Sequence, residues 1–176
     1  MFEFDLDEVP YLGAADAPHV VMNLFDYSCQ HCRVLHGFLG EARRTFSNDL
    51  GIVSLPAPLD PGCNALVPRH LPDHTNACVY ARIGLTVWRA DRQQLESFDR
   101  WMFTPARPPT TEAARQHAIG LVGAEAFARA SQDPWIESQL EQATRLFATN
   151  YQLSRISSLP QLVIGTNIVV GNFRRV

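Results

Sequence analysis

The sequence predicts an α/β fold in which a small β-sheet domain carries helices inserted between its two halves. Short apolar segments typical of buried strands lie near both ends of the chain. Between residues 75 and 150, apolar residues instead recur at helical spacing. The chain has 176 residues and is 46% hydrophobic, which suits one domain with an insertion and a core of its own.

The first half of the predicted sheet begins at residues 19–25 (His-Val-Val-Met-Asn-Leu-Phe), an apolar segment with β-branched residues. The motif Cys29-Gln30-His31-Cys32 follows at once. After it, apolar residues at helical spacing predict an amphipathic helix of about four turns: Leu35, Leu39, Ala42 and Phe46. Residues 51–55 then predict a second core strand, ended by Pro56 and Pro58.

Four helices are expected in the middle of the chain. Each has apolar residues on one face: Cys78, Ala81, Leu85 and Trp88; Leu95, Phe98, Met102 and Phe103; Ala114, Ala118 and Leu121; Ile136, Leu140, Ala143 and Phe147. Thr110 is the expected N-cap of the third helix, and Pro134 fits the first turn of the fourth. Residues 162–164 and 168–170 predict a closing β-hairpin.

Composition excludes several classes of function. All 15 basic residues are arginine, so Schiff-base lysine chemistry and a lysine-containing phosphate loop are absent. The net charge of −3, without a run of like charges, argues against nucleic-acid partners. No segment approaches the ~20 apolar residues that span a bilayer, and the N-terminus lacks signal-peptide features. We expect a soluble protein, or a soluble domain of a longer membrane-attached or exported one.

The Cys29-Gln30-His31-Cys32 motif has the spacing of a redox-active dithiol or disulfide. Two cysteines at a helix start come within disulfide range, and the unpaired N–H groups there stabilise a thiolate. Because the thiolate attacks disulfides, Cys29 is the expected exposed nucleophile and Cys32 the buried resolving thiol. The His31 imidazole is expected to stabilise the Cys29 thiolate, which makes the disulfide more oxidising. We therefore expect the Cys29 pKa toward the acidic end of a range of about 3.5 to 7.

Two other interpretations of this motif stay open. A Cys-x-x-Cys pair is often half of a zinc site, and His36 would supply a third ligand. Zinc pairs usually lie on loops, whereas this motif lies between a core strand and a long helix. The other interpretation is an inert structural disulfide.

Cys63 and Cys78 form a second pair, across a long loop and into a helix start. We expect a structural disulfide worth about 3 kcal/mol, and two cysteine pairs fit an oxidising compartment. A second redox pair, a reduced pair and a zinc site are the alternatives. In the zinc alternative, His70 and His74 would join Cys63 and Cys78 as ligands, since His70, His74 and Cys78 would share one face of a helix. Pro72 argues against a continuous helix there.

Three segments resemble the DsbA-like branch of the thioredoxin fold: residues 17–21, 26–33 and 158–163. The likeness extends from about residue 12 to 172 and is greatest to the DsbA-like domains found free or fused to vitamin K epoxide reductase homologues. It implies a thioredoxin-like fold with an inserted helical subdomain. Residues 1–60 and 156–176 would form its βαβ and ββ halves, and residues 61–155 the insertion.

The resemblance also implies roles for particular residues. Pro160 would be the cis-proline that faces the motif, and its loop would form part of a groove that pairs with an extended, cysteine-containing peptide. Leu159, Gln30 and Tyr27 are expected to contact that substrate. No cofactor is expected, and a membrane redox partner would reset the motif. The expected location is periplasmic or otherwise extracytoplasmic.

The sequence departs from the family at three places. The family often has a buried acid six positions before the nucleophile, where this chain has Asn23. Asp26 is either its substitute or a solvated turn residue. Gln30 replaces a common proline, so no redox potential transfers from a relative. The sequence also ends at Val176, where relatives continue into a closing helix.

We therefore expect a thiol–disulfide oxidoreductase that exchanges disulfides with unfolded or cysteine-containing proteins, as a dithiol oxidase. The alternative from another class is a metal-binding or metal-delivery protein that uses the same cysteines as ligands.

Overall fold

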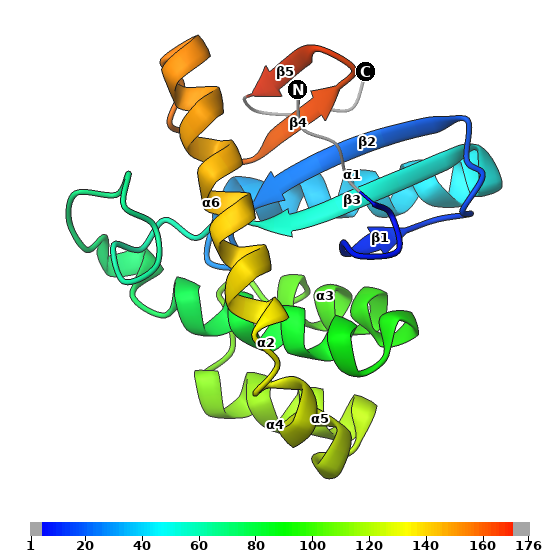
Figure 1. Cartoon of the computed structure of the whole chain (residues 1–176), viewed down its shortest axis with the longest axis vertical. Helices are drawn as coiled ribbons and strands as arrows, with labels where there is room; N and C mark the ends of the chain where they lie inside the picture. Colours follow the sequence, from blue (N-terminus) through cyan, green and yellow to red (C-terminus); the bar gives the residue numbers. More distant parts are fainter. Residues whose placement is uncertain (1–4, 171–176) are drawn as a thin grey trace.

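The computed structural model describes residues 5–170, which fold around a five-stranded sheet of order β1-β3-β2-β4-β5 (Figure 1). The strands are β1 (Tyr11–Leu12), β2 (His19–Phe25), β3 (Leu50–Pro56), β4 (Gln161–Ile164) and β5 (Asn167–Val170). β2 and β3 are parallel, and the remaining pairs are antiparallel. The parallel pair is central, which places the end of β2 deep in the molecule.

Helix α1 (Gln30–Phe46) connects the two parallel strands and crosses one face of the sheet (Figure 1). Such a crossover is required because parallel neighbours cannot be joined by a tight turn. Leu35 and Cys32 are the buried residues of α1, whereas Phe46 at its end is 57% exposed. The amphipathic face predicted for this helix is therefore wrong at Phe46, where the helix has passed the edge of the core.

The segment between β3 and β4 is helical. It contains α2 (Ala77–Ala90), α3 (Leu95–Phe103), α4 (Thr111–Val122), α5 (Ala124–Ala130) and α6 (Trp135–Ser154). Thr110 is the N-cap of α4, and its side-chain oxygen accepts a hydrogen bond from the backbone N–H of Ala113 at 3.2 Å. The described residues contain no helix long and apolar enough to cross a membrane.

The sheet and the helices share one hydrophobic core. Its largest cluster joins strand residues such as Leu24 and Leu55 to Phe98 of α3 and Phe147 of α6. α6 lies across the face of the sheet opposite α1, while α2 to α5 lie below the β1 edge of the sheet in this view (Figure 1). The insertion is therefore packed against the sheet as one body.

The predicted architecture, an α/β sheet with helices inserted between its two halves, is confirmed. One strand and one α-helix were not predicted: β1, and α5, which starts directly after Gly123 ends α4 at a φ of 85°. The boundaries proposed at residues 60/61 and 155/156 stay a prediction. Residues 1–4 and 171–176 of the proposed halves, with the chain end at Val176, lie outside the described residues.

The loop from β3 to α2 is closed by a disulfide between Cys63 and Cys78, whose Cα atoms are 6.0 Å apart. Buried polar side chains hold the same loop. Asn64 donates to the Pro58 carbonyl at 2.8 Å, and the Asp60 carboxylate accepts from the Gly62 N–H at 2.9 Å. The loop is thus fixed in shape although it has little regular structure.

We predict that replacing both cysteines of this disulfide, Cys63→Ala with Cys78→Ala, lowers the free energy of unfolding by about 3 kcal/mol, because the unfolded chain regains the entropy of an open loop. Urea unfolding of the oxidised protein and the double variant measures this difference. A loss below about 1 kcal/mol would show that the loop's hydrogen bonds keep it closed without the bond.

Candidate active site

Cys29 occupies the N-cap position of α1, in extended backbone conformation. Its sulfur accepts a hydrogen bond from the backbone N–H of Cys32 at 3.3 Å. The Cys32 thiol also donates to it, and this hydrogen bond is the largest contribution that lowers the Cys29 pKa, to about 7. The backbone N–H groups of Cys32 and His31 lower the pKa further, whereas burial and the Asp26 charge raise it. Cys29 therefore titrates near neutral pH.

Cys32 lies one turn further along α1 and is buried. The backbone N–H of Asp26 donates a hydrogen bond to its sulfur at 3.4 Å. Burial, together with the neighbouring Cys29, raises the Cys32 pKa well above its usual value. In this reduced pair the negative charge is thus held on Cys29, as the order of the motif predicted.

Two expectations for Cys29 need correction. Its pKa of about 7 is at the upper end of the predicted range, because burial and Asp26 oppose the helix start. Cys29 is also only 7% exposed, so its sulfur is reached from one side alone. The His31 imidazole lies exposed, and it is the His31 backbone N–H that lowers the Cys29 pKa.

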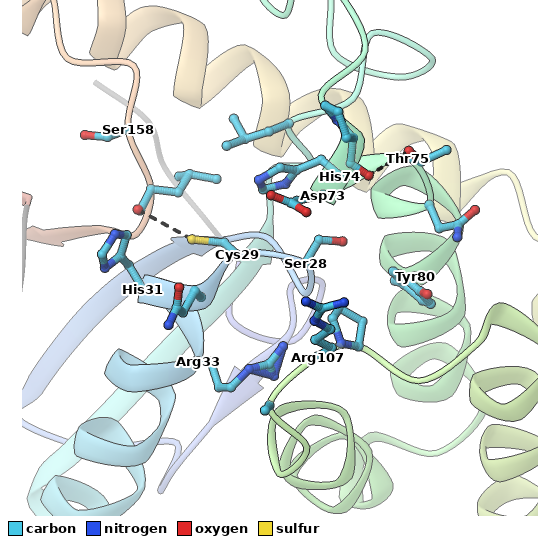
Figure 2. A pocket seen from close by; sticks show the side chains of 17 residues that line it. Ser28, Cys29, His31, Arg33, Asp73, His74, Thr75, Tyr80, Arg107 and Ser158 are labelled. Carbon is cyan, nitrogen blue, oxygen red and sulfur yellow. Dashed lines mark hydrogen bonds between the residues drawn. The ribbon is translucent and has the colours of Figure 1, made fainter.

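The peptide bond between Leu159 and Pro160 is cis, and this loop lies against the cysteine pair. The Cys29 thiol donates to the Leu159 carbonyl at 3.6 Å (Figure 2). Gln161 is fully buried behind the loop, and its side-chain amide donates to the carbonyls of Ile156 and Ser158 at 3.3 Å. Asn150 of α6 donates to the Gln161 side chain at 2.9 Å. The inserted segment therefore helps to hold the cis-proline loop.

A groove of about 770 Å³ opens over Cys29 (Figure 2). The start of α1 and the cis-proline loop form one side of it. The loop before α2 and the connection between α3 and α4 form the other. Its lining includes Gln30, His31, Leu159, Asp73, His74 and Arg107. Two of the residues expected to contact substrate, Gln30 and Leu159, thus lie in the groove beside the reactive sulfur.

Positive side chains outnumber acids in this groove. Arg33 and Arg107 line it, while Asp73 is the acid in its lining. Arg33 is held by hydrogen bonds from its guanidinium to the carbonyls of Met102 and Phe103, at 3.5 and 3.4 Å. Burial lowers the pKa of Arg33, and the charges of Cys29 and Cys32 partly oppose that effect. Arg33 therefore adds to the positive field around the thiolate.

Tyr27, which was expected to contact substrate, is instead buried in the core. Its hydroxyl donates to the Asp99 carboxylate at 2.5 Å, and its ring stacks on Phe103. Gly84 of α2 makes this possible, because a Cβ there would overlap the Tyr27 hydroxyl. Burial raises the pKa of Asp99 to about 7. Tyr27 is thus a structural link between the motif and the insertion.

The residues considered as zinc ligands are not brought together. Cys63 and Cys78 are bonded to each other, and His70 and His74 each face a different carboxylate, Asp60 and Asp26. His36 packs against the Phe103 ring, with centroids 4.6 Å apart. Within residues 5–170, no group of three potential ligands surrounds a common point.

Asp26 is buried, so its interpretation as a solvated turn residue is wrong, while its role as a substitute for the family's acid stays a prediction. Its carboxylate accepts hydrogen bonds from the backbone N–H groups of Ser28 at 2.7 Å and Leu59 at 2.8 Å. The His74 ring nitrogen Nδ1 lies 2.7 Å from it. Asn23, at the family's usual acid position, leaves its side-chain oxygen without a partner.

His74 and Arg107 are groove residues that sequence reasoning did not place at the site. His74 was considered only as a metal ligand, because it is far from the motif in sequence. The feature that could have placed His74 near the site was the disulfide between Cys63 and Cys78, because it ties the loop that carries His74 to the start of α2.

We predict that iodoacetamide alkylates Cys29 of the reduced protein with a rate that rises with pH around a midpoint of about 7, because the thiolate is the reacting form. In Cys32→Ala the midpoint should move upward, since the hydrogen bond that lowers the Cys29 pKa most is lost. Mass spectrometry of timed samples measures both rates, and an unchanged midpoint would contradict this account.

The sequence matches no described protein family and no curated protein. Among solved structures, the thiol-disulfide exchange protein alpha-DsbA2 from Wolbachia pipientis is similar, with a TM-score of 0.71, 17% identity, and coverage of 94% of this chain and 81% of that one. BdbD from Bacillus subtilis has a TM-score of 0.67, 17% identity and coverage of 95% and 86%. A periplasmic thioredoxin-like protein from Salmonella enterica serovar Typhimurium has a TM-score of 0.66, 19% identity and coverage of 95% and 83%. This chain therefore has the thioredoxin-like fold of DsbA-like thiol–disulfide oxidoreductases.

Proposed function

We propose that this protein is a thiol–disulfide oxidoreductase that exchanges disulfides with cysteine-containing protein substrates, and that it acts as a dithiol oxidase. The observation that carries the proposal is the asymmetry of the cysteine pair. Cys29 has a pKa near 7 and faces a groove, while Cys32 is buried behind it with a raised pKa. In such a pair, one sulfur is suited to react with the substrate, and the other is suited to resolve the mixed disulfide that results.

The proposed reaction starts from the oxidised Cys29–Cys32 pair. A substrate thiolate attacks the Cys29 sulfur, the bond between the cysteines breaks, and its electron pair leaves on Cys32. A second substrate thiolate then attacks the first substrate sulfur and releases Cys29 as a thiolate. The substrate dithiol loses two electrons and two protons. The cysteine pair gains both electrons, Cys32 takes up one proton, and the other proton goes to the solvent because Cys29 leaves as a thiolate. In the opposite direction, Cys32 resolves the mixed disulfide on Cys29.

The proposed direction, oxidation of substrate dithiols, rests on the stabilised Cys29 thiolate. Whatever stabilises the reduced form makes the disulfide a stronger oxidant. A pKa of about 7 is close to that of thioredoxin and far from the ~3.5 of the most oxidising relatives. We therefore expect a moderate oxidant, well below the ~−120 mV extreme.

Substrates are proposed to bind as extended peptides along the cis-proline loop. The Leu159 carbonyl already accepts a hydrogen bond from Cys29, so the main chain of this loop borders the reacting sulfur. Gln30, at the start of α1, lines the same groove. Pro160 has no N–H to donate, which leaves the neighbouring main-chain groups to pair with a peptide.

The proposed location is periplasmic or otherwise extracytoplasmic. A second disulfide, Cys63–Cys78, fits an oxidising compartment, where such bonds persist. Continued oxidation of substrates requires a partner that accepts electrons from the reduced cysteine pair, and a membrane redox protein is the proposed partner.

The test is oxidation of a reduced peptide that contains two cysteines. The oxidised protein should convert it to the disulfide form, and Cys29→Ser should abolish the reaction. Cys32→Ser should instead accumulate a mixed disulfide between Cys29 and a test peptide that is already disulfide-bonded, because the resolving thiol is missing. Equilibration with glutathione then gives the potential of the pair, which decides between an oxidase and a reductase.

The alternative, a metal-binding or metal-delivery protein, uses the same two sulfurs. Metal analysis of the protein after aerobic purification separates it from the proposal. One zinc per chain, lost together with Cys29→Ser and accompanied by no peptide oxidation, would overturn the oxidoreductase assignment.

A further inference from the structure

A buried carboxylate and a histidine form a pair beside the two cysteines. Asp26 follows the end of β2, and His74 ends a short 3-10 helix, η2 (Pro72–His74), in the loop before α2. His74 Nδ1 lies 2.7 Å from Asp26 Oδ2. Because the carboxylate accepts at Nδ1, the neutral ring carries its proton there and leaves Nε2 free to accept another.

Both residues of the pair lie close to the cysteines. The backbone N–H of Asp26 donates to the Cys32 sulfur at 3.4 Å. His74 lines the groove together with Cys29, and Figure 2 shows its ring on the wall of the groove near that sulfur. The hydrogen bond to Asp26 raises the pKa of His74 most, burial opposes it, and the charges of Asp26 and the Cys29 thiolate add to the rise. The histidine thus shares the groove with the sulfur that a substrate thiol would attack.

The structure holds His74 in this position from several sides. Its side chain is 15% exposed, and its backbone N–H donates to the Leu71 carbonyl at 2.9 Å. The second oxygen of Asp26 is not free to turn, because it accepts from Ser28. The Cys63–Cys78 disulfide closes the loop that carries His74. A fixed ring held by a buried carboxylate is the arrangement by which enzymes orient a general base.

We propose that His74 is a catalytic general base and acid for disulfide exchange at Cys29, and that Asp26 is the residue that positions it. This inference rests on the proposed oxidoreductase function and adds the proton acceptor that the Asn23 position lacks. The closing experiment separates the failure of one from the failure of the other.

In the proposed step, a substrate thiol gives its proton to His74 Nε2 while its sulfur bonds to the Cys29 sulfur. The bond between Cys29 and Cys32 breaks, and its electron pair leaves on Cys32. His74 then returns the proton to Cys32, whose thiol form is favoured by burial. The sum is one thiol and one disulfide converted to one mixed disulfide and one thiol, with no net change in protons.

Several charged or titratable groups face His74 and contribute to its pH response. They come from the end of β2, the start of α1, the histidine's own loop, α2 and the α3–α4 connection: Asp26, Cys29, His31, Arg33, Asp73, Tyr80 and Arg107. Among them, Asp26 makes the direct hydrogen bond, and burial opposes its effect on the His74 pKa.

The experiment compares His74→Asn with a matched control, His70→Asn, in the full chain. An asparagine amide can keep the hydrogen bond to Asp26 but cannot carry the proton. His70 lies on the same loop, its side chain is 72% exposed, and it faces Asp60 instead of Asp26. The oxidised proteins react with a single-cysteine peptide between pH 5.5 and 9.5. Samples quenched with acid at timed intervals are analysed by mass spectrometry, which gives the rate at which the mixed disulfide with Cys29 forms.

At pH 7.5, where a free cysteine with a pKa of about 8.5 is still mostly protonated, His74→Asn should react about 10-fold more slowly than the unaltered protein. This difference should shrink toward pH 5.5, because the hydrogen bond to Asp26 raises the pKa of His74 and a protonated ring accepts no further proton. At pH 9.5 the two rates should agree within about threefold, because the peptide is already a thiolate and needs no base. His70→Asn should follow the unaltered protein at every pH. A purely structural role of His74 would slow the reaction equally at pH 7.5 and at pH 9.5.

Equal pH profiles for His74→Asn and the unaltered protein would overturn the role of His74 and leave the proposed function intact. Failure of the unaltered protein to form any mixed disulfide would overturn both. If His74→Asn does not fold, as judged by circular dichroism, His74→Gln is measured in the same way and must show the same loss at pH 7.5. Asp26→Asn should show a smaller loss at pH 7.5 and none at pH 9.5, because it releases the ring without removing it.

Discussion

The site depends on the start of α1, where the N–H and the thiol of Cys32 both donate hydrogen bonds to the Cys29 sulfur. These contacts exist because β2 ends, turns at Asp26 and enters the helix within a few residues. The parallel pairing of β2 and β3 requires a helix to cross the sheet at this point. The crossover from β2 to α1 is therefore also what places the hydrogen-bond donors at the Cys29 sulfur.

The spacing of apolar residues along the sequence was sufficient to predict most of the strands and helices. The segment 19–25 became β2 with the same bounds, and the apolar faces around Phe98 and Phe147 became buried sides of α3 and α6. Helix α5 escaped prediction because it is short and follows Gly123 without a loop. The exposed Phe46 shows the limit of periodicity, which reports a helix face but not where the neighbouring core ends.

The site was predictable only where its residues are adjacent in sequence. Cys29 and Cys32 belong to one motif, and Pro160 was placed opposite them by resemblance. His74 meets Asp26 across 48 positions, and only the folded β3–α2 loop brings them together. Tyr27 illustrates the opposite error. Its position beside the motif suggested substrate contact, but its partner Asp99 lies on α3 and draws the side chain into the core.

The balance at Cys29 has a consequence for the direction of exchange. Hydrogen bonds at the helix start lower its pKa, while burial and Asp26 raise it, and the result is about 7. A thiol attacks fastest when its pKa is near the ambient pH, because a lower pKa yields more thiolate but a weaker nucleophile. Cys29 is thus suited both to attack a disulfide and to leave from one. The reduction potential of the pair, together with its redox partner, then decides the net direction.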